Sequence, residues 1–309
     1  MQNSISDRPA WISVLLIFLT SMAGFMIIGP LIGVLFALPF VEGSFMDFLL
    51  NVTNPINHPE LKTPLFIVQG CATFLGLIVG PALYLFAIEK KNPFQLVSQR
   101  QLYGFILLLT AGIVIFFMAT NSIFIEWNAN IHLPEALKAF ELWAREKEDF
   151  ATQLTKFLTK FDSIGQFILA FVVIAILPGI GEELVFRGLL QPELYRATKN
   201  IHVAIWISAI LFSAIHMQFF GFVPRVLLGA LFGYLYYWSG DLRIAMFAHF
   251  VNNGFQVLMM YLNQLGIIQV DIESTEAAPW PMVAGFTIIT FGLLVYLKKF
   301  YAARNTTLL

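Results

Sequence analysis

Six polar side chains in otherwise apolar sequence could carry out acid–base chemistry together. They are Glu182, Glu183, Arg187, His216, His249 and Asn253. Ionisable groups are costly to place inside a membrane, so each of them is a candidate for function. A carboxylate and a histidine can take a proton from water, and a histidine and an amide that point together can stabilise an oxyanion.

The spacing of the two glutamates gives them different partners. Adjacent residues on a helix are rotated by about 100°, so Glu182 and Glu183 cannot point the same way. Glu183 and Arg187 are four residues apart and can pair on one face, which leaves Glu182 to face another group. Pro178 and the glycines that follow it predict a kink or break just before the acids. The alternative is that both acids only hold helices together.

The two histidines have different neighbours along the chain. His249 and Asn253 are four residues apart and share a helical face, whereas Asn252 is turned away from it. That face would offer two donors to one point. His216 shares a face with Phe212 and is a functional candidate because Glu182 is present. The alternative for each of these groups is an ordinary hydrogen bond between packed helices.

The composition indicates lipid as the solvent of the elements that carry these residues. Apolar residues make up 58% of the 309-residue chain and charged residues 12%, whereas a soluble domain has about 25% charged residues. Eight stretches are apolar enough and about long enough to span a bilayer: 11–40, 64–88, 102–125, 164–188, 202–220, 222–239, 244–264 and 281–297. We therefore expect an all-α, polytopic membrane helical bundle.

The charge and cysteine content exclude other classes of protein. The net charge is −1 and no basic block is present, so nothing indicates a nucleic-acid partner. The single cysteine, Cys71, excludes a disulfide within the chain and is expected to act as a small buried apolar residue.

The distribution of lysine and arginine predicts that both termini are cytoplasmic. Basic residues gather in alternate loops, at Arg8, Lys90, Lys91, Arg100, Arg196, Lys199, Arg243, Lys298, Lys299 and Arg304. The segment 127–163 also holds basic residues, nearly balanced by acids, and is expected to form an amphipathic helix lying on the outer membrane surface. The short loops suit a bacterial inner membrane.

The polar residues divide the chain into three parts. Residues 1–163 hold three spans without intramembrane charge and the amphipathic outer segment. Residues 164–264 hold four spans and all six candidate site residues. Residues 265–309 hold an outer loop, a last span and a basic tail.

Three motifs in order on successive spans resemble the CPBP/ABI family, which includes the type II CAAX prenyl endopeptidases. They are Glu-Glu-x-x-x-Arg at 182–187, Phe-x-x-x-His at 212–216 and His-x-x-x-Asn at 249–253. The resemblance covers about residues 178–254. It implies an eight-helix fold with a water-filled cavity inside the membrane, and hydrolysis of a peptide bond without a covalent enzyme intermediate.

The same resemblance implies a role for each residue. Glu182 and His216 would orient and deprotonate the attacking water, and His249 and Asn253 would stabilise the oxyanion. Glu183 and Arg187 would hold the site in shape, with Arg187 also able to attract a substrate carboxylate. The substrate would be a peptide or a membrane protein within the lipid bilayer.

Two questions stay open at the level of sequence. Glu182, His216 and His249 could instead supply a His₂Glu zinc site with an open position for water, although we favour no obligatory metal. Counting residues from the inner surface puts His216 deep, and His249 and Glu182 shallow, so the side chains meet only if helices tilt or shift.

Two other functions fit the same polar residues. In a proton- or ion-coupled transporter, Glu182, His216 and His249 would form a relay, although no duplicated half is visible. In a non-catalytic scaffold or immunity protein, these residues would only hold the fold together.

Overall fold

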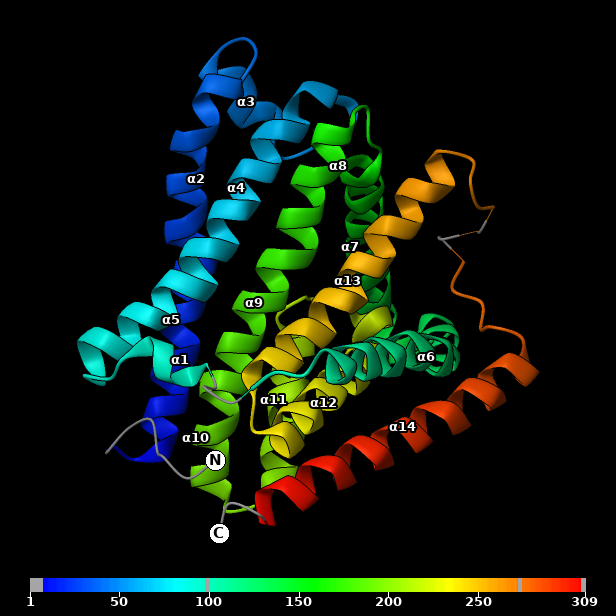
Figure 1. Cartoon of the computed structure of the whole chain (residues 1–309). Helices are drawn as coiled ribbons and strands as arrows, with labels where there is room; N and C mark the ends of the chain where they lie inside the picture. The colour runs from blue at the N-terminus through cyan, green and yellow to red at the C-terminus, as the bar shows by residue number, and fades with distance from the viewer. Residues whose placement is uncertain (1–7, 98–100, 270, 272–273, 307–309) are drawn as a thin grey trace.

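The protein is a bundle of helices, and no strand occurs in the residues described. The computed structural model describes residues 8–97, 101–269, 271 and 274–306. Helix α1 (Ala10–Ala23) begins and α14 (Trp280–Thr306) ends near one end of the bundle, which we call the terminal end (Figure 1). Helix α3 (Phe45–Asn51) lies and α8 (Ile164–Ala170) begins at the opposite end, which we call the distal end. The predicted all-α membrane bundle is confirmed.

Six helical stretches within the described residues are long and apolar enough to cross a membrane. They are Ala10–Phe40, Pro59–Ile88, Gly104–Ala129, Ile164–Thr198, Phe219–Ser239 and Trp280–Arg304. The other two predicted spans form helices that fall short of this standard. Helix α11 (Ile201–Ala214) has only 14 residues, and the apolar character of α13 (Leu242–Gln264) is interrupted by His249, Asn252 and Asn253.

The first two spans are built from α and π segments that cross closely. The first comprises α1 (Ala10–Ala23), η1 (Gly24–Ile28) and α2 (Gly29–Ala37), and the second comprises α4 (Lys62–Phe74), η5 (Leu75–Val79), α5 (Gly80–Leu83) and η6 (Tyr84–Ile88). A Cβ atom on Gly29 would lie 2.5 Å from the Ala72 Cα. Small residues let helix backbones approach in a membrane, where packing drives association. Cys71, expected to be buried, is a partly buried free thiol at this crossing.

The fourth span is longer than the sequence predicted, and Glu182 lies further from its end. It joins α8 (Ile164–Ala170), η9 (Phe171–Ile176), α9 (Leu177–Glu183), η10 (Leu184–Leu190) and α10 (Gln191–Thr198). Because the helix runs to Thr198 and not to 188, Glu182 lies about 24 Å from its terminal end at 1.5 Å per residue. The polar residues of α10 continue the helix beyond the predicted end of the span, and Glu182 lies near the middle of its 35 residues.

The fifth span is shorter than predicted, and this change places His216 outside the helix. Helix α11 ends at Ala214 after about 21 Å, less than the roughly 30 Å of a hydrocarbon core. The chain then turns through η11 (Phe219–Gly221) into α12 (Phe222–Ser239). His216 therefore lies in the turn. Helix α13 crosses the long fourth span obliquely (Figure 1), and its His249 contacts Glu183 of that span.

Helix α7 (Lys138–Thr159) packs lengthwise against the bundle beside α8 and α13 (Figure 1). It follows α6 (Gly104–Ala129). Near its start, Phe140 meets Phe219 at 4.8 Å between ring centroids, and near its end, Leu158 joins a core cluster with Phe66. An amphipathic helix forms within 127–163 as predicted, and it contacts α8 and α13, while Leu142, Trp143 and Phe150 of its apolar face are exposed. Its place on the membrane surface stays a prediction.

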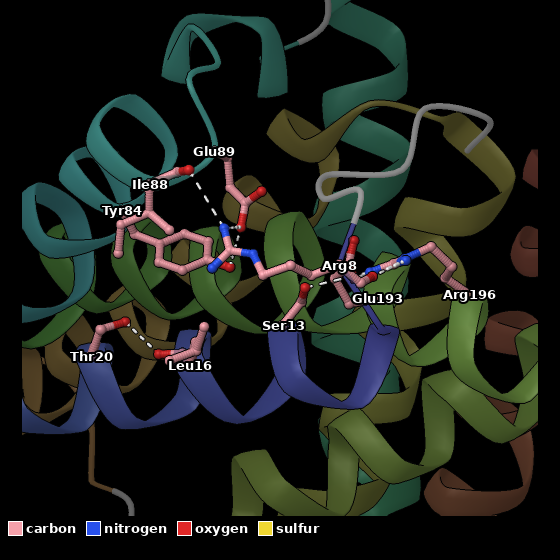
Figure 2. A network of polar contacts seen from close by, with 9 residues as sticks. All are labelled: Arg8, Ser13, Leu16, Thr20, Tyr84, Ile88, Glu89, Glu193 and Arg196. Atoms are coloured by element: carbon pink, nitrogen blue, oxygen red, sulfur yellow. Dashed lines mark hydrogen bonds and ion pairs between the residues drawn. The ribbon is translucent and has the colours of Figure 1, made fainter.

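A polar network ties three segments together near the terminal end (Figure 2). Arg8 pairs with Glu89 at 2.8 Å, and the Tyr84 hydroxyl donates to the same carboxylate. Arg196 pairs with Glu193 on α10 and donates to the backbone oxygen of Arg8. The start of α1, the end of η6 and α10 are thereby held side by side.

We predict that Gly29→Ala lowers the stability of the folded protein by about 1–3 kcal/mol or more, as overpacking does elsewhere. The added methyl group would overlap the backbone of α4. The matched control is Gly292→Ala on α14, where no atom lies within 4 Å of an added Cβ. Reversible unfolding in mixed detergent micelles measures both variants. Equal stability of the two would contradict the close crossing.

Candidate active site

Glu182 and Glu183 lie where the α-helical turn α9 passes into the π-helical segment η10. A second π segment, η9, ends just before Pro178. The predicted break is wrong, because the helix absorbs the proline by widening its turns and stays continuous. Such π segments often occur at functional sites. Here they set the directions of two adjacent carboxylates.

Glu183 and Arg187 form a fully buried ion pair. Arg187 Nη1 lies 2.8 Å from Glu183 Oε1, and both side chains have 0% exposure. Arg187 Nη2 donates to the Gly229 backbone oxygen on α12 at 2.7 Å. The guanidinium also lies over the Phe212 ring, 4.8 Å from its centroid, a favourable cation–π placement. The predicted pairing is present, and it connects α9, α11 and α12.

Glu183 also holds His249 on α13. His249 Nδ1 lies 2.8 Å from Glu183 Oε1, so this nitrogen carries a proton that it donates to the carboxylate. His249 Nε2 then points toward Glu182, with 4.0 Å to Oε2. The histidine is therefore placed between the two glutamates, one of which fixes its ring while the other faces its second nitrogen.

His216 is oriented by the residue one helical turn before it. Its Nδ1 lies 2.8 Å from the Phe212 backbone oxygen, and a carbonyl can only accept, so Nδ1 carries the proton and Nε2 is left as an acceptor. The Phe212 ring makes edge contacts with both His216 and His249, at 5.2 Å and 5.7 Å between centroids. Phe212 thus separates the histidines at a fixed spacing.

The two asparagines of α13 act together. Asn252 Nδ2 donates to Asn253 Oδ1 at 3.0 Å, and Asn253 Nδ2 donates to the Ile174 backbone oxygen at 3.0 Å. Each amide nitrogen has two protons, so Asn253 keeps one for a ligand. Asn252, expected to point away, lies at the same cavity.

A cavity of about 460 Å³ brings the candidate side chains together. Its polar lining residues are Asn121, Glu182, His216, Arg225, His249, Asn252, Asn253 and Gln256. Glu182 Oε2 is buried and has no hydrogen-bond partner among the described residues. Glu183 and Arg187 lie behind this lining. The unpaired carboxylate oxygen therefore has room beside it for a water molecule.

Sequence reasoning gave no role to three residues of this lining. Arg225 donates to Gln218 at 2.7 Å, and its Nη1 is buried without a partner in the described part of the chain. Asn121 donates to the Pro224 backbone oxygen, and Gln256 to that of Asn252. A charge at the start of an apolar span is a signal that could have identified Arg225.

The residues suggested for zinc do not form a ready metal site. Among the described residues, no three His, Cys, Asp or Glu side chains are grouped so that they could hold a metal ion. His249 Nδ1 is held by Glu183, which leaves Nε2 as the nitrogen that could bind a metal, and Glu182, His216 and His249 line the same cavity. We therefore derive no step through a metal.

The central part of the chain is similar to known proteins. The family model described as type II CAAX prenyl endopeptidase Rce1-like matches residues 164–255. YpbD, an uncharacterized protein of Bacillus subtilis (strain 168), is 29% identical over 84 residues, which are 26% of this chain and 40% of YpbD. The membrane-embedded CAAX protease MroQ of Staphylococcus aureus (strain USA300) is 30% identical over 96 residues, 29% of this chain and 38% of MroQ.

Each of these two matches covers only part of this chain and only part of the relative. The chain spans less than half the length of either relative, and no solved structure matches it significantly. All six polar side chains of the three motifs fall inside the matched residues. Residues 164–255 of this multi-pass membrane protein are thus similar to the Rce1-like family of type II CAAX prenyl endopeptidases.

Proposed function

We propose that this protein is an intramembrane endopeptidase in which Glu182 and His216 activate a water molecule. The observation that carries the proposal is the cavity where an unpaired Glu182 oxygen faces His249, with His216 Nε2 free to accept. Two acceptors that line one cavity suit a water that must lose a proton. The similarity of residues 164–255 to the Rce1-like endopeptidases supports peptide-bond hydrolysis as the reaction.

The hydrolysis follows from these positions. Water donates a proton to Glu182 as its oxygen attacks the peptide carbonyl carbon, with His216 Nε2 accepting the second water hydrogen bond. The carbonyl oxygen becomes an oxyanion, which the free amide proton of Asn253 stabilises together with His249, whose Nε2 has taken a proton from solvent before the attack and donates it in a hydrogen bond. Glu183 is the counter-ion of His249 in that state. The proton on Glu182 then passes to the leaving amine, the C–N bond breaks, and an acid and an amine result.

The substrate class and location follow from the surroundings of the site. The cavity opens among membrane-spanning helices, so the substrate is a peptide segment of a membrane protein or a membrane-bound peptide. We propose a bacterial inner membrane with both termini cytoplasmic, since basic residues gather near the terminal end.

We predict that Glu182→Gln lowers the rate of peptide cleavage by about 10²–10⁴, the range for loss of a general base. The amide keeps the size of the side chain but cannot take the proton. Purified protein in detergent is given a peptide library, and new termini are read by mass spectrometry. Gln256→Glu, on the same cavity, is the control for a changed charge. A folded Glu182→Gln protein with full activity would refute the glutamate base.

We predict that Arg187→Ala lowers the yield of folded protein as well as activity. Removing one partner of a buried ion pair typically costs about 3–5 kcal/mol, because Glu183 would be left charged and buried. The double variant Glu183→Gln/Arg187→Met should recover the folded yield without activity. Size-exclusion profiles measure the yield. A stable but inactive Arg187→Ala protein would instead assign Arg187 to substrate binding.

We predict that a strong chelator leaves cleavage by the purified protein unchanged, because Glu182 and His216 supply the proton acceptors. The measurement is the cleavage rate after prolonged dialysis against chelator, with and without added zinc. Complete loss that zinc restores would show that Glu182, His216 and His249 hold a metal.

A further inference from the structure

We propose that the substrate segment reaches the site from the distal end of the bundle, through a polar cavity between α7 and α13. The inference rests on the proposed endopeptidase function. It names the side of the membrane on which the substrate is cut, and so the class of substrate.

The site cavity extends toward the distal end. On α13 its lining begins at His249 and continues through Asn253 to Gln256, and on α12 it is confined to the first turns, from Gly221 to Leu228. Helix α13 runs toward the distal end (Figure 1). The catalytic side chains therefore lie at the inner limit of the cavity.

A second cavity, of about 490 Å³, continues the same path. Its walls include Thr152, Thr155 and Thr159 of α7 and Asn263 of α13. The two cavities share Ile125 of α6. Met260, which also lines the second cavity, lies about one turn beyond Gln256 on α13, so the second cavity adjoins the first.

One hydrogen bond joins the two cavities. Gln218, which lines the second cavity, accepts from Arg225 of the site cavity at 2.7 Å. Arg225 Nη1 is buried and has no partner among the described residues. A cationic donor at the junction is thus left for a carbonyl or carboxylate of a peptide that passes it.

The chemistry of the path suits an extended polar peptide. Hydroxyl and amide groups from α7 and α13 can replace water around peptide groups inside the membrane, where an unpaired backbone group costs several kcal/mol. An apolar groove of about 1060 Å³ offers a lateral alternative. It lies against Ile180 and Leu184 and has no lining residue in common with the site cavity, so α9 stands between that groove and the site.

With both termini in the cytoplasm, the distal end faces outward. The substrate class is then an exported peptide, or a segment of a membrane protein exposed on the outer side. A cytoplasmic chain end would have no polar path to Glu182 through these two cavities.

Thiol labelling tests the path without requiring catalysis. In a Cys71→Ala background, Gln256→Cys places one thiol in the site cavity. A membrane-impermeant maleimide is added to intact cells that produce the full chain. We expect Gln256→Cys to be labelled, and Thr155→Trp to slow the labelling about tenfold, because an indole would fill the space between α7 and α13.

The matched control is Glu146→Trp, on the opposite face of α7 and exposed, which should leave the labelling rate unchanged. Thr152→Trp is a second obstruction should Thr155→Trp fold poorly. Labelling only after the cells are permeabilised would overturn the distal direction, and labelling that neither tryptophan slows would overturn the path. If the protein cleaves no peptide but Gln256→Cys is labelled as expected, only the endopeptidase proposal is contradicted.

Discussion

The site depends on one carboxylate oxygen, Glu183 Oε1, which is bonded at 2.8 Å to both Arg187 and His249. A buried charge is tolerated only when it is paired and hydrogen-bonded. Arg187 satisfies that condition and also reaches the backbone of α12 at Gly229. Three helices are therefore fixed relative to one another by the same group that sets the orientation of His249. The adjacent Glu182 is left unpaired toward the cavity because the pairing is complete without it.

Irregular backbone lies near this carboxylate, and side chains from distant segments form hydrogen bonds with its backbone groups. The turn after α11 lies within the bundle, where unpaired backbone groups are costly. Asn128 of α6 accepts from the Val223 amide and donates to the Phe219 oxygen, and Glu148 of α7 accepts from the Phe220 amide. Burial raises the pKa of Glu148. Helix α7 thus stabilises the turn that carries His216.

Local signals in the sequence were enough to find the membrane class, the Glu183–Arg187 pair and the residues that share the cavity. The helix period predicted that Glu182 and Glu183 point differently, and the structure places them at opposite nitrogens of His249, with Glu183 also paired with Arg187. The sequence did not predict the π segments around Pro178 or the early end of α11. It also did not predict that Asn252 faces the cavity. Each of these features depends on contacts from other helices. The roles of Arg225 and Glu148 were missed for the same reason, since their partners lie on other segments. The functions of the six side chains stay proposals.

The surroundings of the site depend on two helices whose lengths differ from the sequence prediction. The fourth span continues to Thr198, so Glu182 lies near its middle, and α11 stops at Ala214, so His216 lies in the turn that follows. A full-length fifth span would have filled the space on the distal side of His216 with apolar side chains. Because the helix is short, that space is lined instead by α6, α12 and α13 and covered by α7. The same shortening that exposes His216 therefore creates the room that water and a peptide need.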